Sequence, residues 1–283
     1  MNLVSIAIVT YNANLSLLKQ NIIKYLKFNL NVYIFDNGSS NYFQLMELGQ
    51  SYSNVTIISK MKNLGIAYAL NSLFKLGEEN GDKWILTFDQ DSKIENTSLH
   101  TYLKYIKEFD DCYKIAMLCP QIIDVNVNKV VFGGKGEYEE INSAEDSITS
   151  GSCIRVSSWR KVGGFYNKLF IDFVDTDFQE KLLLRNYKII RLNKVRLFHS
   201  IGRAKDIKFL GFTIHCSNHN SFRRYYMVRN RLYFYRKYYG NSMYYKALIK
   251  LSLGTIKIIL FEDEKKGKVK AFFKGWKDYK KIL

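Results

Sequence analysis

Residues 84–92 read Trp-Ile-Leu-Thr-Phe-Asp-Gln-Asp-Ser, a short and mainly apolar run that ends in polar and acidic side chains. Such a run is typical of a strand that is buried on both faces of a parallel sheet. Residues two apart in an extended chain point the same way, so Asp89 and Asp91 would project from one side of the strand end. This stretch predicts an α/β fold with acidic groups at the carboxyl edge of its sheet.

The chain around this strand repeats the pattern. Further strands are predicted at residues 4–11, 32–36, 55–59 and 115–119, and helices at 15–28, 42–50, 66–76 and 98–109. Alternation of strands and helices predicts βαβ units and a mostly parallel sheet flanked by helices. Ligands of such sheets bind beyond the carboxyl ends of the strands. The polar or small residues at those ends are Thr10, Tyr11, Asn12, Asp36, Asn37, Asn63 and Gly65.

Asp89 and Asp91 form an Asp-x-Asp pair. Two carboxylates on one side of a strand end repel each other, and the repulsion raises the pKa of one of them. A hard divalent cation such as Mg²⁺ or Mn²⁺ relieves the repulsion, commonly together with a bound diphosphate. The alternative interpretation is a solvated acidic turn. The pair is therefore a candidate metal site whose assignment depends on its surroundings.

A second acidic cluster, Asp172, Asp175 and Asp177, precedes the helical pattern of residues 178–184. Aspartate is a favoured N-cap, and the helix dipole favours acids in the first turn. Capping uses one carboxylate, however, and the surrounding residues 170–178 are otherwise mainly apolar. A spare carboxylate in apolar surroundings is a candidate general base because burial raises its pKa towards the working pH. The carboxylates of this cluster that capping does not use are therefore candidates for this role.

His199 ends a short apolar run that a glycine follows at position 202. A lone histidine is more often structural than functional. Neutral imidazole is nevertheless a common metal ligand, so His199 is a candidate third ligand beside the acidic pair.

These motifs, in this order, together with Ser-Gly-Ser at residues 150–152, resemble glycosyltransferase family 2, whose members are inverting enzymes of the GT-A fold. Three motifs are most similar to the bacterial rhamnosyltransferase branch of that family: Phe-Asp-Gln-Asp-Ser at 88–92, Phe-Ile-Asp-Phe-Val-Asp at 170–175 and Tyr-Tyr-x-x-Arg-Asn at 225–230. The resemblance extends over about residues 4–239.

The resemblance implies roles for the nucleotide and metal residues. Asp36 would accept a hydrogen bond from N3–H of uracil or thymine, and Asp89 would lie near the ribose and the metal. Asp91 and His199 would bind Mn²⁺ or Mg²⁺ beside the diphosphate. The remaining residues of the nucleotide-sugar pocket would be Thr10, Tyr11, Asn12, Asn37, Asn63 and Gly65.

The resemblance also implies roles on the acceptor side. Asp175 would be the catalytic base, and Asp177 would orient that base or the acceptor. Ser150, Gly151 and Asp172 would lie near the acceptor or the transferred sugar. Residue 174 is valine where many family members carry an acid, so the choice between Asp172 and Asp175 as the base rests on the resemblance, which favours Asp175.

The expected reaction is attack by an acceptor hydroxyl on the anomeric carbon of a nucleotide-diphosphate sugar. The branch implies dTDP-L-rhamnose as donor and a polyprenyl-diphosphate-linked saccharide as acceptor, in the synthesis of a bacterial surface polysaccharide such as O-antigen or capsule. A UDP-sugar-dependent galactofuranosyl, galactosyl or glucosyl transferase is the alternative within the class. A nucleotidyltransferase is disfavoured because residues 10–14, Thr-Tyr-Asn-Ala-Asn, form no glycine-rich basic loop.

Positive charge gathers in the last fifth of the chain. The formal net charge is +17, and 17 basic against 4 acidic residues from Ser221 onward contribute +13 of it. This asymmetry indicates a polyanionic partner, either an anionic membrane surface or nucleic acid. In residues 268–283, lysines lie opposite Trp, Phe and Leu, which is typical of a helix at a membrane surface. A helix packed on the protein is the alternative, and nucleic acid is disfavoured because no such binding motif is present.

We therefore expect a catalytic domain over residues 1–220, with a nucleotide-sugar half of about 1–95 and an acceptor half of about 96–220. A basic, aromatic and helical region follows over residues 221–283. No signal peptide or transmembrane run is visible, and the four cysteines suit a reducing compartment. The expected location is cytoplasmic, at the inner leaflet of the plasma membrane. A non-catalytic basic adaptor for membranes or nucleic acid is the alternative from another class.

Overall fold

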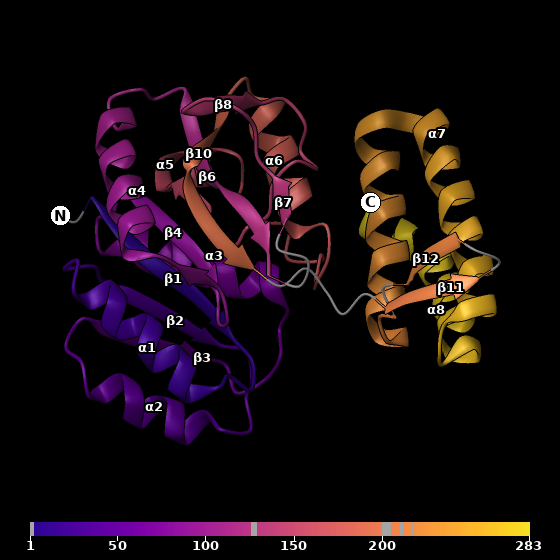
Figure 1. The fold of residues 1–283 in the computed structure, drawn as a ribbon, viewed down its shortest axis with the longest axis horizontal. Coiled ribbons are helices and arrows are strands. Elements are labelled where there is room, and N and C mark those ends of the chain that lie inside the picture. Colours follow the sequence, from indigo (N-terminus) through magenta and orange to yellow (C-terminus); the bar gives the residue numbers. More distant parts are fainter. Residues whose placement is uncertain (1–2, 126–128, 200–204, 210–211, 217) are drawn as a thin grey trace. The chain divides into compact units, whose positions relative to one another are not determined.

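Two compact units make up the chain in the computed structural model (Figure 1). The first comprises Met1–Asn167 and Asp175–Ser200, and the second comprises Lys168–Val174 and Ile201–Leu283. We call the first the sheet unit and the second the helical unit. The residues that the structure describes are 3–125, 129–199, 205–209, 212–216 and 218–283.

A ten-stranded sheet is the centre of the sheet unit, and the order of its main path is β3-β2-β1-β4-β9-β6-β10-β5. Parallel pairing joins β1 (Val4–Thr10) to β2 (Val32–Asp36) and to β4 (Trp84–Asp89), and joins β2 to β3 (Val55–Ser59). The other strands are β5 (Lys93–Ile94), β6 (Ile115–Asp124), β7 (Lys129–Phe132), β8 (Tyr138–Ile141), β9 (Cys153–Arg155) and β10 (Lys188–His199). Only β6 and β10 among these pair in parallel in the described part of the sheet.

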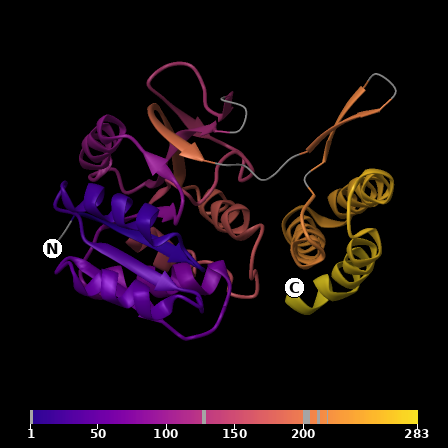
Figure 2. The ribbon, with the colours of Figure 1, turned by 60° about the horizontal axis from the view of Figure 1, so that its bottom comes forward.

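Helices cover both faces of this sheet, which confirms the predicted α/β architecture (Figures 1 and 2). The helices are α1 (Leu15–Leu26), α2 (Tyr42–Gln50), α3 (Ile66–Glu79), α4 (Asn96–Phe109), α5 (Val156–Lys161) and α6 (Val174–Leu183). Ile6 and Ile8 of β1 share one buried core with Leu18 of α1 and Leu99 of α4. On the opposite face, Phe35 of β2 contacts Tyr68 of α3. Alternate residues of a strand point to opposite faces, so each buried strand supplies two cores.

The register of the parallel strands brings their polar ends together. Thr10 of β1 pairs with Asp36 of β2, and Asp36 pairs with Ser59 of β3. Val9 of β1 pairs with Asp89, the last residue of β4. The loops that follow these strands therefore leave the sheet at the same edge, as the strand order predicts.

The helical unit contains α7 (Ser221–Phe261), α8 (Lys265–Asp278), a short 3₁₀ helix η1 (Tyr279–Ile282) and the hairpin of β11 (Lys205–Phe209) and β12 (Phe212–Cys216). Gly240 interrupts α7 with φ 74° and ψ −162°, a conformation that glycine adopts easily. Gly275 lets α8 pack closely on α7, since a Cβ there would lie 2.7 Å from the carbonyl oxygen of Tyr225. The predicted helical C-terminal region is confirmed. No helix among the described residues is long and apolar enough to cross a membrane.

Candidate active site

Asp36 is the most enclosed of the predicted site residues. Its Oδ2 accepts hydrogen bonds from the backbone N–H of Gly38 at 3.1 Å and of Ser39 at 3.2 Å, and from the hydroxyl of Ser59 at 3.1 Å. Its Oδ1 is also buried and has no hydrogen-bond partner among the described residues. A buried carboxylate oxygen without a donor is unfavourable. Asp36 therefore retains an acceptor that a ligand N–H can satisfy.

The loops after β1, β2 and β4 are joined by side chains that bond to backbone. The backbone N–H of Tyr11 donates to Oε1 of Gln90 at 2.8 Å, and Nε2 of Gln90 donates to the Tyr11 carbonyl at 3.3 Å. Oδ1 of Asn12 accepts from the N–H of Ser40 at 2.9 Å. The Thr10 hydroxyl donates to the carbonyl of Phe35 at 3.3 Å. Tyr11 is thus joined to the loop of the Asp-Gln-Asp motif, and Thr10 and Asn12 are joined to β2 and the loop after it.

Asn37, Asn63 and Gly65 shape the backbone ahead of α3. Oδ1 of Asn37 accepts from the N–H of Leu64 at 2.8 Å, and Oδ1 of Asn63 accepts from the N–H of Gly65 at 3.0 Å. Gly65 precedes α3 with φ 86°, a left-handed conformation. The first backbone N–H groups of a helix favour anions such as phosphate. This position suits the predicted nucleotide role.

A chain of hydrogen bonds connects Asp89, Ser150 and His199, which are far apart in sequence. The Ser150 hydroxyl accepts from the N–H of Asp89 at 3.1 Å and lies 2.7 Å from the hydroxyl of Ser92. That hydroxyl lies 3.2 Å from Nδ1 of His199, whose Nε2 is 3.8 Å from Oδ2 of Asp89. The structure thus brings together three predicted residues. Ser92, the link between them, lay in the quoted motif but had been given no role.

Asp91, the other predicted metal ligand, is exposed on the turn between β4 and β5. No group of three or more His, Cys, Asp or Glu side chains suited to hold a metal occurs in the described part of the chain. Asp89 and His199 supply a carboxylate and an imidazole within 3.8 Å of each other. Mg²⁺ at nucleotide sites commonly takes one or two carboxylates and completes its shell with substrate phosphates and water. The donor set at Asp89 and His199 fits such an ion.

Gly151 has a backbone role beside this chain of bonds. Its φ is 78°, and a Cβ would lie 2.8 Å from side-chain atoms of both Pro120 and Leu197. Its carbonyl accepts from the hydroxyl of Tyr102 at 2.7 Å. These contacts fix the backbone that presents the buried hydroxyl of Ser150 to Asp89.

The three acids Asp172, Asp175 and Asp177 differ in burial and in their partners. Asp175 is half-buried in the first turn of α6, where its Oδ1 accepts from the N–H of Thr176 at 2.9 Å. Asp177 is fully buried, and its Oδ2 lies 2.9 Å from Nζ of Lys181. Asp172 belongs to the helical unit and pairs with Nη2 of Arg223 at 3.0 Å. Of the two residues in α6, Asp175 is the one with solvent access, as a base requires.

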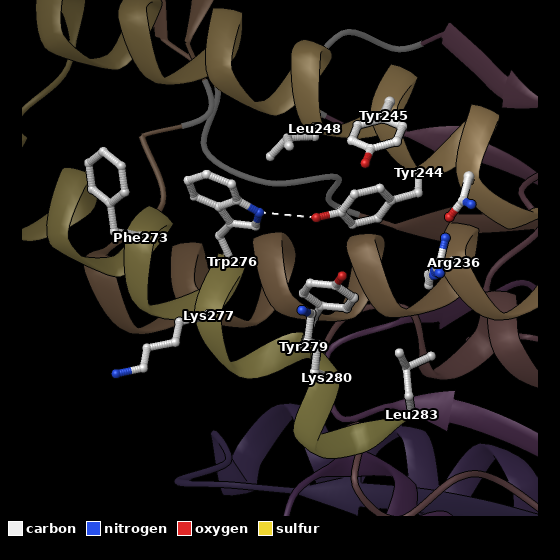
Figure 3. Close-up of a pocket in the computed structure, with 11 residues that line it drawn as sticks. Arg236, Tyr244, Tyr245, Leu248, Phe273, Trp276, Lys277, Tyr279, Lys280 and Leu283 are labelled. Carbon is white, nitrogen blue, oxygen red and sulfur yellow. Dashed lines mark hydrogen bonds between the residues drawn. The ribbon is translucent and has the colours of Figure 1, made fainter.

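The helical unit also contains a hollow of about 920 Å³ between the second half of α7, α8 and η1 (Figure 3). Nε1 of Trp276 donates to the hydroxyl of Tyr244 at 3.1 Å across it. Burial raises the pKa of Tyr279 to about 12, so this hydroxyl stays neutral at physiological pH. The lining residues are aromatic, basic or apolar with one amide: Arg236, Asn241, Tyr244, Tyr245, Leu248, Phe273, Trp276, Lys277, Tyr279, Lys280 and Leu283.

Comparison with known proteins agrees with the sheet and its polar edge. The family model of glycosyl transferase family 2 matches residues 5–142. The dTDP-rhamnosyl transferase RfbF of Shigella flexneri is 30% identical over 247 residues, a match that covers 81% of this chain and 79% of that protein. The chain belongs to glycosyl transferase family 2. This family 2 protein is accordingly a glycosyltransferase with a rhamnosyltransferase-like sequence.

Solved structures show the same fold. The crystal structure of TarS from S. aureus matches 100% of this family 2 chain with a TM-score of 0.62 at 16% identity. The chain spans about half of that protein, 49% of its length. A structure of TarS residues 1–349 matches with a TM-score of 0.57 at 14% identity, covering 100% of this chain and 92% of the other. The expected GT-A fold is confirmed.

Proposed function

We propose that this glycosyltransferase moves L-rhamnose from dTDP-L-rhamnose to a hydroxyl of a polyprenyl-diphosphate-linked saccharide. The product would be part of a bacterial surface polysaccharide such as O-antigen or capsule. The observation that carries the choice of donor is the 30% identity with a dTDP-rhamnosyl transferase over most of both chains.

Asp36 supports a pyrimidine nucleotide. Its buried Oδ1 lacks a donor in the described structure, and N3–H of thymine or uracil would supply one. Thymine and uracil present the same N3–H, so this contact suits dTDP- and UDP-sugars alike. The preference for dTDP over UDP is therefore supported by the identity with the dTDP-rhamnosyl transferase alone. The preference for a pyrimidine base is supported by Asp36.

Asp175 would act as the general base. It would take the proton of the acceptor hydroxyl while the acceptor oxygen forms its bond to the anomeric carbon and the bond from that carbon to the diphosphate breaks. A single displacement of this kind inverts the anomeric configuration. Asp89 and His199 would hold Mn²⁺ or Mg²⁺, which would supply positive charge against the diphosphate when bound, with Asp91 on the adjacent exposed turn as the further candidate ligand. The Ser92 and Ser150 hydroxyls would keep His199 and Asp89 in place through their hydrogen bonds.

Thermal stabilisation by a panel of donors, with and without Mn²⁺, tests the donor assignment. A ligand at about 100 times its Kd adds about 2.7 kcal/mol of stability, which is a measurable shift in Tm. We expect a metal-dependent shift that is larger with dTDP-L-rhamnose than with UDP-galactofuranose, UDP-galactose or UDP-glucose. Stabilisation by UDP-sugars alone would favour the UDP-sugar transferase instead. No shift with any of these nucleotides would contradict the proposed donor class.

We further propose that the helical unit attaches the enzyme to the inner leaflet of the plasma membrane, where a lipid-linked acceptor lies. Tyr245, Ile249, Leu253, Ile256 and Leu260 recur at spacings of three and four residues along α7, and each is more than half exposed. Such spacing forms one stripe along a helix. A large exposed apolar stripe indicates a binding surface. We call these five residues the apolar stripe.

The charge beside the apolar stripe favours an anionic bilayer over a protein partner. Residues 241–261 carry Lys246, Lys250 and Lys257 and no acidic residue. The aromatic and basic hollow of Figure 3 shares Tyr245 with the stripe. Lysines around exposed apolar side chains, with Tyr and Trp at their border, are typical of helices that lie in a membrane interface.

Flotation with vesicles tests this attachment. We expect the protein to float with phosphatidylglycerol vesicles at low ionic strength and to remain behind with phosphatidylcholine vesicles. The variant Ile249→Asn/Leu253→Asn/Ile256→Asn should lose most of this binding. Val130→Asn/Val131→Asn, on exposed valines of β7, is the matched control and should float normally. A wild-type protein that stays in the soluble fraction with both vesicles would contradict the proposal.

A further inference from the structure

The segment Lys168–Val174 has an unusual position in the chain. The residues before it and after it belong to the sheet unit, but its own contacts assign it to the helical unit. Asp175, the proposed base, is the next residue. The backbone at Asp172 and Phe173 has φ values of 63° and 64°. This left-handed region is unfavourable for residues other than glycine, and two such residues in succession persist only when neighbouring contacts hold them.

Asn230 of α7 provides those contacts. It is fully buried, and its Nδ2 donates to the carbonyl of Ile171 at 2.7 Å and to the carbonyl of Asp172 at 2.8 Å. Its Oδ1 accepts from Nε of Arg229 at 2.8 Å. Both amide hydrogens and the amide oxygen are therefore used. No other uncharged side chain of this size offers two donors and one acceptor.

Neighbouring residues of α7 hold the same segment at other points. Nη2 of Arg229 donates to the carbonyl of Lys168 at 2.7 Å. The ring of Phe170 stacks on Tyr226 with centroids 5.1 Å apart. The guanidinium of Arg223 pairs with Asp172. Three residues on neighbouring turns of α7 thus contact Asp172, Phe170 and Lys168. Asn230 binds the carbonyls of Ile171 and Asp172, beside and within the left-handed stretch.

We propose that Asn230 is a positioning residue for the Asp175 base. By fixing the backbone at Ile171 and Asp172, its amide sets the direction in which the chain enters α6, and with it the position of the Asp175 carboxylate. A base acts only within hydrogen-bond reach of the proton that it takes. Without the amide, Asp172 and Phe173 would relax towards negative φ, and the first turn of α6 would shift. This inference rests on the proposed role of Asp175.

The variant Asn230→Asp tests the proposal because it keeps the size of the side chain and its acceptor for Arg229. It replaces the two donors by carboxylate oxygens that repel the carbonyls of Ile171 and Asp172. We expect kcat to fall by about 10²-fold, the effect of a misplacement of about 1 Å. The Kd for dTDP-L-rhamnose should stay within a few-fold, because the donor pocket lies at the strand ends. Asn230→Ala, which removes the donors without adding charge, serves if the aspartate variant does not fold.

Thr255→Val is the matched control. Thr255 is also buried in α7, but it accepts a hydrogen bond from Arg224 at 2.9 Å and donates one to the carbonyl of Leu251 at 2.8 Å, so its side chain bonds to other residues of α7. It should destabilise the helical unit and leave kcat near that of the wild type. Equal losses of kcat in Asn230→Asp and Thr255→Val would overturn the positioning role, as would a folded Asn230→Asp protein with normal kcat.

Hydrogen–deuterium exchange provides a readout that does not depend on activity. Amides of residues 169–176 should exchange faster in Asn230→Asp than in the wild type, with little change in Thr255→Val. Unchanged exchange in this segment would overturn the proposal even if activity fell. If exchange increases while Asp175→Asn retains full turnover, Asn230 holds the segment but the assignment of Asp175 as base fails, so the two failures are distinguishable.

Discussion

At the scale of single residues, Asp36 is the residue that we propose to bind the pyrimidine base. Three donors fix its Oδ2, while its Oδ1 is buried without a partner among the described residues. A carboxylate oxygen left in this way is costly to the free protein and favourable for a ligand that donates to it. Asp36 is the last residue of the buried strand β2, which holds its backbone in place.

Asp36→Asn should weaken binding of dTDP. The side-chain oxygen would take the place of Oδ2, because Gly38, Ser39 and Ser59 donate there, and the amide hydrogens would then face N3–H of the base. We expect a loss of about 1.5–3 kcal/mol, or about ten- to a hundred-fold in Kd by calorimetry. Ser59→Ala removes one donor from Oδ2 and leaves Oδ1 in place, so it should change Kd far less. An unchanged Kd in folded Asp36→Asn would exclude the contact.

Much of the candidate site followed from the positions of residues at strand ends. Thr10, Asp36 and Asp89 could be grouped because parallel strands share a carboxyl edge. Ser92 could not be assigned from sequence, since its bonds to Ser150 and His199 join segments that are 58 and 107 residues away. Asn230 was visible only as part of a motif, because its partners lie in a different segment.

At the scale of elements, the apolar strands were predicted most closely. The predicted strands 32–36 and 55–59 have the observed bounds of β2 and β3, and β4 (Trp84–Asp89) lies within the run 84–92, while β6 extends five residues further than expected, to Asp124. Burial on both faces gives such strands a clear pattern. The break of α7 at Gly240 was not predicted, because a single glycine within an aromatic helix does not reveal its φ. The β11–β12 hairpin was not predicted either.

The pairing of Lys268 with Glu262 fixes the turn between α7 and α8. Both side chains are nearly fully buried, and their charged atoms are 3.0 Å apart. Lys268 is buried and so does not belong to an exposed lysine face of α8. Removing one partner of a buried ion pair typically costs about 3–5 kcal/mol, because the other charge stays buried without compensation.

Lys268→Met should therefore increase hydrogen–deuterium exchange of the α8 amides by the equivalent of about 3–5 kcal/mol of local stability. The double variant Lys268→Met/Glu262→Gln removes both charges and should recover most of that loss. Equal exchange in Lys268→Met and wild type would show that the pair contributes nothing to the docking of α8.

At the scale of the whole molecule, most of the positive charge lies in the helical unit. Residues from Ser221 onward carry +13 of the net +17, and they form the helices of the helical unit. The charge count predicted a basic C-terminal region, and the spacing of its lysines and apolar residues predicted that it is helical. The assignment of Lys168–Val174 to the helical unit was beyond sequence reasoning, since it depends on contacts with α7 residues 51 to 61 positions away.

The central claim is that Asp175 serves as the base in transfer from dTDP-L-rhamnose. The most direct measurement compares dTDP release by the wild type and by Asp175→Asn, with bacterial membranes as the source of lipid-linked saccharides. We expect the variant to lose about 10²- to 10⁴-fold in kcat, as removal of a general base does, while its Kd for dTDP-L-rhamnose stays within a few-fold. Full turnover by Asp175→Asn, or a wild-type enzyme that uses UDP-sugars and not dTDP-L-rhamnose, would contradict the account.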